Sequence, residues 1–345
     1  MFFAQRDSLS LIRWSPHRNI LGTVGASGHF SVYDPAQTAR LYWREKQAET
    51  RFSNLLCLCW SPARASHQTE LVAFGGQAGI VEVWDVRSGQ RVCTYTGHSP
   101  EVAELPTSLP PNRRPISALA WSDDGSLLAS AGNDMRVHIW RPESGELCAV
   151  ADGEPFRAGC LLAWLDHRTL ISSSGNHVYI WDARTGRVLQ EIQTPLAWEK
   201  SNAYALAPNR QRLAVAVGSS VLLYNLRTGE QDGQYSPMDL FYDDPYYRGS
   251  PSLVAWNPDG HRLAACFASR PKRIVFWSMR GKKTLQVYQH FADITCLDWS
   301  ADGSMLAWGG EGYVTTAAFA QPLVLPSHAL PDHASSTIET SPAPF

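Results

Sequence analysis

One sequence unit recurs along the whole chain, and this repeat limits the folds that the chain can adopt. The unit is clearest between Ile116 and Trp140, which read ISALAWSDDGSLLASAGNDMRVHIW. Three short apolar runs are separated there by turns rich in Gly, Asp and Asn, the residues that tolerate tight backbone turns. A fourth apolar run, from Leu147 to Ala151, follows the turn sequence PESGE. The unit therefore predicts an antiparallel meander of four strands, about 40 residues long.

Two anchor positions, most of them aromatic, mark the copies of this unit. The first anchor ends the first run at Trp14, Trp60, Trp121, Trp164, Leu206, Trp256 and Trp299. The second anchor ends the third run at Tyr33, Trp84, Trp140, Trp181, Tyr224 and Trp277. Blades of this length bury their faces against each other, so seven copies predict an all-β, seven-bladed propeller of four-stranded antiparallel blades.

The residues around the second anchor resemble those of the WD-repeat family. The Trp-Asp pair of that family is present at Trp84–Asp85 and Trp181–Asp182, with Tyr33–Asp34 as a near match. The resemblance covers about Met1 to Ala320 and implies one propeller domain over residues 1–320. It does not imply an activity, because this fold hosts many unrelated functions.

The resemblance also implies a buried hydrogen-bonded set of His, Ser, Asp and Trp within a blade. All four residue types occur in the third copy alone, at His98, Ser130, Asp134 and Trp140. A structural role for His98 is preferred over a role as a catalytic base. The other blades are expected to be held together by hydrophobic packing.

The seventh copy needs a fourth strand, because an open blade edge leaves backbone groups unpaired. Phe2–Phe3 precede the first anchor of their copy by as many residues as Val287–Tyr288 precede theirs. The N-terminal strand Met1–Ala4 is therefore predicted to close the ring, with Leu323–Leu325 as the competing segment. Residues 321–345 are rich in Pro, Ser and Thr and are predicted to be largely disordered.

Composition argues against several partner classes. The formal net charge of −2 predicts no general attraction to nucleic acid or anionic lipid, and no run approaches the ~20 apolar residues of a membrane-spanning helix. The seven cysteines lie mostly within strand patterns, which predicts reduced thiols and a cytoplasmic protein. Cys57 and Cys59 have no second pair at zinc-site spacing, so no metal is predicted.

Catalytic motifs are missing from the sequence. It holds neither a GxSxG nor an HExxH pattern, and the adjacent carboxylates Asp243 and Asp244 are interpreted as solvated. No catalytic residue and no cofactor are therefore predicted. The alternative is a propeller enzyme whose groups converge at the channel mouth.

Two long connections between blades carry the strongest functional signal. Trp84 and Trp121 are 37 residues apart and Tyr224 and Trp256 are 32 apart, against 22 for Trp277 and Trp299. These insertions, Ser99–Pro115 and Ser236–Pro251, and a third connection hold aromatic residues and arginines of the kind enriched at protein interfaces. The candidate binding residues are Trp198, Phe241, Tyr242, Tyr246, Tyr247, Arg248, Arg113 and Arg114.

All three connections join a fourth strand to the next first strand, so they are expected on one face of the propeller. The composition predicts a noncatalytic scaffold that binds a protein or peptide through this face. The competing interpretation is that the aromatic side chains fold inward and plug the channel mouth.

A third hypothesis is contact with RNA. The basic runs Arg270–Arg273 and Arg280–Lys283 are expected in two different turns of blade six. Those turns project from opposite faces, so the two runs do not form one basic track.

Overall fold

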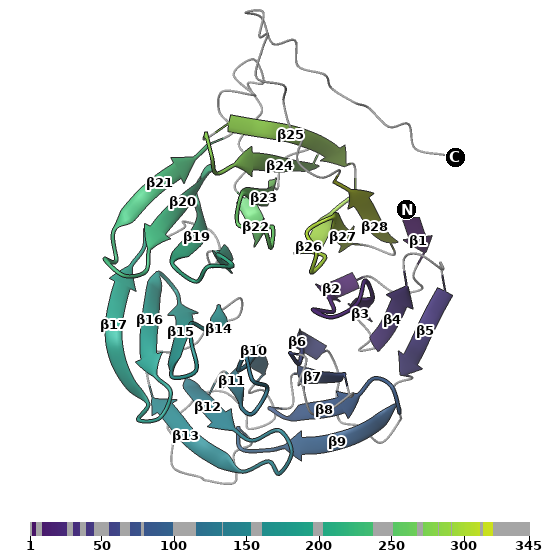
Figure 1. Cartoon of the computed structure of the whole chain (residues 1–345), viewed down its shortest axis with the longest axis vertical. Helices are drawn as coiled ribbons and strands as arrows, with labels where there is room; N and C mark the ends of the chain where they lie inside the picture. Colours follow the sequence, from purple (N-terminus) through teal and green to yellow (C-terminus); the bar gives the residue numbers. More distant parts are fainter. Residues whose placement is uncertain are drawn as a thin grey trace, which may run out of the picture.

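The computed structural model describes residues 2–4, 9–25, 30–34, 39–44, 55–62, 70–76, 79–98, 115–132, 134–152, 161–195, 203–236, 251–267, 272–281, 283–290, 292–310 and 313–319. The elements assigned in this part of the chain are all β-strands. It contains no helix that is long and apolar enough to cross a membrane. The strands form seven four-stranded antiparallel sheets arranged around a central axis (Figure 1).

Each sheet is one blade, and its strands run outward from the axis in sequence order, except in blade seven, where the outer strand is β1. The innermost strands are β2 (Leu9–Trp14), β6 (Leu55–Trp60), β10 (Ile116–Trp121), β14 (Leu162–Trp164), β18 (Ala203–Leu206), β22 (Pro251–Trp256) and β26 (Ile294–Trp299). The second strands are β3 (Leu21–Gly25), β7 (Leu71–Gly76), β11 (Leu128–Gly132), β15 (Thr169–Ser174), β19 (Arg212–Val217), β23 (Arg262–Phe267) and β27 (Met305–Gly310).

The third strands are β4 (Phe30–Asp34), β8 (Val81–Asp85), β12 (Arg136–Trp140), β16 (His177–Asp182), β20 (Ser220–Asn225), β24 (Lys272–Ser278) and β28 (Tyr313–Ala318). The outer strands are β5 (Ala39–Arg44), β9 (Gln90–Tyr95), β13 (Leu147–Asp152), β17 (Arg187–Gln193), β21 (Gln231–Tyr235), β25 (Lys283–His290) and β1 (Phe2–Ala4). Blades one to seven are numbered from the innermost strands β2 to β26. The predicted seven-bladed propeller is confirmed, and every first anchor ends an innermost strand.

The N-terminal strand closes the ring, as predicted. β1 pairs antiparallel with β28, in the register Phe2 opposite Thr315, Phe3 opposite Val314 and Ala4 opposite Tyr313. Figure 1 shows β1 beside β28, so the first strand of the chain completes the last blade. Leu323–Leu325, the competing segment, and the predicted tail 321–345 lie outside the described residues.

The hydrophobic core consists of layers between blades. Seven clusters of buried side chains are present in the described residues, and each joins two neighbouring blades around the full circle. The layer between blades seven and one includes Ile12, Trp14 and Val314. Burial of apolar surface between every pair of neighbours makes the ring one cooperative body, since no blade covers its own faces alone.

Five of the six tryptophans at the first anchor, all except Trp121, also bond across the blade boundaries. Their indole N–H groups donate to the main-chain carbonyl of the residue before the first anchor in the preceding blade. These bonds run from Trp14 to Asp298 (3.2 Å), Trp60 to Arg13 (3.1 Å), Trp164 to Ala120 (3.0 Å), Trp256 to Ala205 (3.1 Å) and Trp299 to Ala255 (3.3 Å). Leu206 of blade five has no N–H to donate, so the boundary between blades four and five lacks this bond.

Hydrophobic packing is not the only force within the other blades, so that prediction was incomplete. In blade four the indole N–H of Trp181 donates to the Ser172 hydroxyl at 2.7 Å. In blade two the indole N–H of Trp84 donates to the carboxylate of Glu82 at 2.8 Å. A tryptophan N–H that is removed from water needs an acceptor, and these two blades supply different ones.

Candidate functional site

A buried polar network lies in blade three, where the sequence placed the His-Ser-Asp-Trp set. His98 follows β9, Ser130 lies on β11, Asp134 lies in the turn between β11 and β12, and Trp140 ends β12. The Nδ1–H of His98 donates to Asp134 Oδ2 at 2.7 Å, and its Nε2 lies 2.8 Å from the Ser130 hydroxyl. The indole N–H of Trp140 donates to the same hydroxyl at 3.1 Å. The structure therefore joins the four residues in one hydrogen-bonded chain.

Two further residues, His138 and Tyr95, extend this network. Nδ1 of His138 lies 2.7 Å from the Tyr95 hydroxyl, and the His138 ring stacks on His98 with centroids 3.9 Å apart. Tyr95 in turn stacks on Trp140, with centroids 4.3 Å apart and planes 7° from parallel. Since Tyr95 ends β9 of blade two, the network also links two blades.

Sequence analysis did not identify His138, although a signal was present. His138 stands two residues before Trp140 on β12, and side chains two apart on a strand point to the same face. Its partner Tyr95 comes from another blade and has no such local signal.

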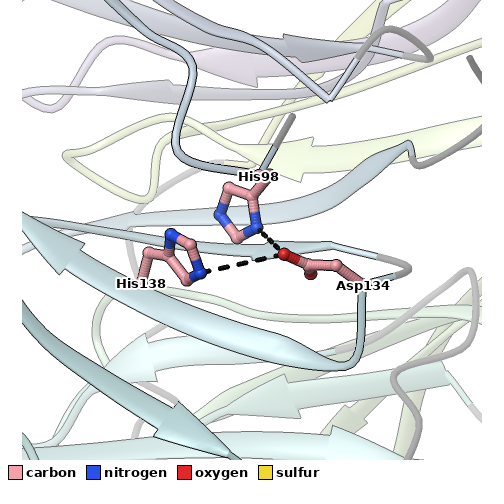
Figure 2. A group of neighbouring side chains, drawn as sticks. All are labelled: His98, Asp134 and His138. Atoms are coloured by element: carbon pink, nitrogen blue, oxygen red, sulfur yellow. Dashed lines mark hydrogen bonds and ion pairs between the residues drawn. The ribbon is translucent and has the colours of Figure 1, made fainter. Parts of the chain in front are cut away.

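The Asp134 carboxylate is the negative centre of the network (Figure 2). It is 6% exposed, and its Oδ2 lies 2.7 Å from His98 Nδ1 and 3.7 Å from His138 Nε2. Burial raises the pKa of this carboxyl, but the hydrogen bond and charge interaction with His98 and the hydrogen bond from the backbone N–H of Arg136 outweigh burial. The net result is a pKa below the ordinary value, so Asp134 is ionised at neutral pH.

The His138 side chain is held neutral. Burial is the main cause, and the charge of neighbouring His98 acts in the same direction against the attraction of Asp134, so that the pKa of His138 falls to about 3. A neutral His138 ring that places Nε2–H toward Asp134 has its Nδ1 lone pair free to accept the hydroxyl hydrogen of Tyr95. The network thus has one consistent arrangement of protons at neutral pH.

His98, Asp134 and His138 also form the one group of potential metal ligands found among the described residues. An imidazole binds a metal through a lone pair in the plane of its ring, at about 2.1 Å. The two rings lie in layers 3.9 Å apart and 20° from parallel, so their lone pairs do not converge on one point. In this arrangement the three residues fit a hydrogen-bonded core and do not fit a metal ion.

The blade-three network also lacks access for a substrate. His98 is 1% exposed, Ser130 0% and His138 4%. A general base must reach the proton that it removes, and these side chains reach only one another. The network therefore acts on stability, by satisfying buried polar groups that would otherwise be unpaired.

Comparison with known proteins identifies the architecture that carries this network. A family model described as "WD domain, G-beta repeat" matches residues 89–141 and 281–314, which span parts of blades two, three, six and seven. This chain is a WD-repeat propeller. The first matched segment contains His98, Ser130, Asp134 and Trp140, so the network lies in the part of the chain with the clearest WD repeat.

Relatives of this WD-repeat propeller include subunits of larger assemblies. The "Eukaryotic translation initiation factor 3 subunit I" of Drosophila erecta is 25% identical over 205 residues, which are 58% of this chain and 62% of the relative. "Protein transport protein SEC31" of Phaeosphaeria nodorum is 28% identical over 159 residues, 40% of this chain and 12% of that protein. This chain thus matches less than two thirds of the length of either relative.

A solved structure shares the fold of the propeller over nearly its whole length. A chain in the crystal structure of the mitotic checkpoint complex superposes with a TM-score of 0.72, covering 93% of this chain and 94% of that one. The two sequences are 17% identical. The likeness therefore concerns the fold.

The predicted binding residues of the WD-repeat propeller lie outside the described residues. Arg113 and Arg114 belong to the connection from β9 to β10, Trp198 to that from β17 to β18, and Phe241, Tyr242, Tyr246, Tyr247 and Arg248 to that from β21 to β22. Asp243 and Asp244 lie in the last of these connections. All three connections join an outer strand to the next innermost strand.

The basic run Arg270–Arg273 is not confined to a turn, which corrects the sequence interpretation. Lys272 and Arg273 are the first two residues of β24. Lys272 forms an ion pair with Asp293 at 3.0 Å, and Arg273 is 7% exposed. Half of the run is therefore unavailable to an external phosphate.

The neutral His138 predicts that the WD-repeat propeller loses stability in mild acid. Below its ordinary pKa of 6.5 this histidine takes up a proton in the unfolded chain. In the folded chain its side chain stays neutral down to about pH 3. The free energy of unfolding should therefore fall as the pH drops from 6.5 toward 3, and His138 should account for about 2 kcal/mol of the loss at pH 5.

Urea unfolding at pH 7.5 and pH 5, compared between the parent and His138→Gln, measures this contribution. The variant should lose about 2 kcal/mol less than the parent between the two pH values. His167→Gln, at an exposed histidine, is the matched control and should follow the parent. Equal losses in parent and His138→Gln would refute the assignment.

Proposed function

We propose that this propeller is a noncatalytic platform that binds a protein or peptide through the face formed by the connections from outer to innermost strands. The observation that carries the proposal is the insertion between β21 and β22. It carries Phe241, Tyr242, Tyr246 and Tyr247 where a spacer would be polar. Tyrosine and arginine commonly dominate the binding energy at the centre of an interface.

The architecture around this insertion supports a role in binding. Tyr235 at the end of β21 is 5% exposed and packs in the core between blades five and six, with Val275 and Trp277. The insertion therefore starts and ends on rigid strands, and a loop on a rigid scaffold is a common place for a binding site. Blade geometry does not require the extra length.

The relatives support the same class of function. The matched initiation-factor protein is named as a subunit, and the superposed chain belongs to a checkpoint complex. We infer that this chain, too, works by holding another protein, and not by a reaction of its own. The six cysteines in the described part of the chain are free, and three of them are buried. Free cysteines agree with a reducing compartment, and we expect a cytoplasmic protein.

Two rival functions receive less support. The acid and base groups of the blade-three network are buried away from any substrate, so they do not favour a propeller enzyme. The ion pair of Lys272 and the burial of Arg273 weaken the RNA hypothesis. Neither of these two observations bears on the aromatic insertion between β21 and β22.

The test of the proposed surface is a Tyr246→Ala, Tyr247→Ala double variant. Partners are first identified by affinity purification and mass spectrometry with the full chain, and again with Phe241–Arg248 deleted. We expect the double variant to keep the parent melting temperature. It should weaken partner binding by more than about thirtyfold, because each tyrosine at an interface centre contributes about 2 kcal/mol.

A Tyr246→Phe, Tyr247→Phe variant is the matched control, because it retains the aromatic area. It should bind more tightly than the alanine variant and melt at the same temperature. A large fall in melting temperature with the partner retained would instead mean that these side chains plug the channel mouth.

A further inference from the structure

A cleft of about 420 Å³ lies between blades five and six. Its two sides are the turns that join innermost to second strands, residues 207–211 between β18 and β19 and residues 257–261 between β22 and β23. Such turns emerge on the face opposite to the connections that carry the aromatic insertion. The volume falls in the range of about 300–1,000 Å³ that is typical of ligand sites.

A contact that joins the next two blades is absent at this cleft. At the boundary of blades six and seven, the Asn257 amide donates to the carbonyl of Gly303 at 2.9 Å. A Cβ on Gly303 would lie only 2.6 Å from Asn257 Oδ1. In the repeat Ala207 corresponds to Asn257 and Gly260 to Gly303, and a Cβ on Gly260 would meet no atom within 4 Å. Ala207 is too short to bridge the gap.

The turn between β18 and β19 in blade five contacts blades three and four through the side chain of Arg210. Arg210 takes the position that glycine holds in the turns of blades three, six and seven, with φ at +57°. An arginine in this backbone region is strained, so its side chain must gain compensating contacts. Its guanidinium pairs with both carboxylate oxygens of Asp123 in blade three and donates to the carbonyl of Leu165 in blade four.

The cleft has an apolar floor between its two turns, and it is also lined by the polar side chains Asn209, Arg212, Asp259 and His261. Trp256 lines it, and the indole N–H of this residue is already bonded to Ala205, which leaves ring carbons for contact. Pro208 and Pro258 line the two turns, and neither has a backbone N–H to donate. An apolar side chain fits the part of the cleft between Trp256, Pro208 and Pro258.

The rim of the cleft carries an uncompensated positive charge. Arg212 pairs with Asp232 at 2.9 Å, and the lining carboxylate of Asp259 pairs with Arg262 at 3.7 Å. Arg280 instead contacts the ring nitrogen Nε2 of His261, a lining residue, at 3.0 Å. A guanidinium only donates, so this histidine nitrogen is the acceptor in the contact. Within the described residues no carboxylate forms an ion pair with Arg280. Its guanidinium is therefore available to a carboxylate of a bound partner.

We propose that this cleft binds a short acidic segment of a protein partner. An apolar side chain of the segment lies between Pro208 and Pro258 against Trp256, and a neighbouring carboxylate pairs with Arg280. Arginine suits this role because its planar guanidinium can hold a carboxylate through two hydrogen bonds. The inference rests on the proposed role as a protein-binding platform and adds a second surface on the opposite face.

The test uses fluorescent peptides in which glutamates flank one phenylalanine, and matched peptides with lysine in place of glutamate. Anisotropy titration of the full chain should show binding of the glutamate peptide that weakens with added salt. Arg280→Glu should reduce the affinity at least about tenfold, because like charges then oppose each other. Arg87→Glu, at the corresponding exposed position of blade two, is the matched control and should bind as the parent does.

A second variant closes the cleft without changing the charge. Ala207→Asn restores the residue that bridges to the next turn at the boundary of blades six and seven. It should abolish peptide binding while the melting temperature stays at or above that of the parent. Unchanged peptide binding in Ala207→Asn, in a chain that still melts cooperatively, would overturn the proposal.

Other outcomes also decide the question. No binding of the glutamate peptide at millimolar concentration, equal binding of the lysine peptide, or equal loss in Arg87→Glu would each overturn the inference. Tighter binding of oligouridine RNA, lost in Arg280→Glu, would identify a phosphate site instead. The Tyr246→Ala, Tyr247→Ala variant should retain peptide binding, so that failure at one face is distinguished from failure at the other.

Discussion

Replacing Asp134 by alanine should lower the free energy of unfolding by about 3 kcal/mol, because a buried histidine N–H then loses its acceptor. The carboxylate accepts the hydrogen bond of His98 at 2.7 Å and lies 3.7 Å from His138. Neither ring can turn to water, since both are almost fully buried. Urea denaturation measures the loss directly.

Two further variants separate the parts of this effect. Asp134→Asn keeps an oxygen acceptor and removes the charge, so its loss should be smaller than that of alanine. Ser130→Ala breaks the other end of the chain of bonds through His98. If the network acts as a unit, the losses of Asp134→Ala and Ser130→Ala should not add in the double variant. Strict additivity would show that the two bonds are independent.

Deleting Met1–Ala4 should lower the free energy of unfolding by about 2 to 3 kcal/mol. The deletion removes three residue pairs between β1 and β28, and each ladder hydrogen bond contributes about 1 kcal/mol. It also exposes the edge of β28, whose backbone groups then have no partner strand.

The matched control for this deletion is removal of Ser327–Phe345, which should leave the unfolding curve unchanged. Thermal and urea unfolding of the parent and both deletions give the comparison. If the N-terminal deletion unfolds like the parent, strand closure by β1 does not contribute to stability.

Periodicity along the chain was sufficient to predict the blades. Apolar runs at regular spacing, separated by turn residues, locate strands because side-chain alternation is a local property of the backbone. The anchor Trp121 ends β10 and the anchor Trp140 ends β12, as the repeat indicated. Closure by Phe2–Ala4 followed from the same counting.

Contacts between blades could not be predicted in this way. Tyr95 and His138 are 43 residues apart, and their bond depends on how blade two packs against blade three. The indole N–H of Trp14 finds its acceptor at Asp298, at the far end of the chain. No local pattern specifies such partners, because they are set by the relative position of two sheets.

The sequence by itself determined the number of blades and the strands within them, because these follow from residue spacing. It favoured Met1–Ala4 over Leu323–Leu325 as the closing strand, and the resemblance to the WD-repeat family implied the His-Ser-Asp-Trp set. Only the tertiary structure decided that His138 joins the set, that its ring stacks on His98 in a way unsuited to a metal, and that a cleft opens between blades five and six. Ala207 and Gly260 line this cleft from neighbouring blades, and the space between them is set by how the two blades pack in the closed ring.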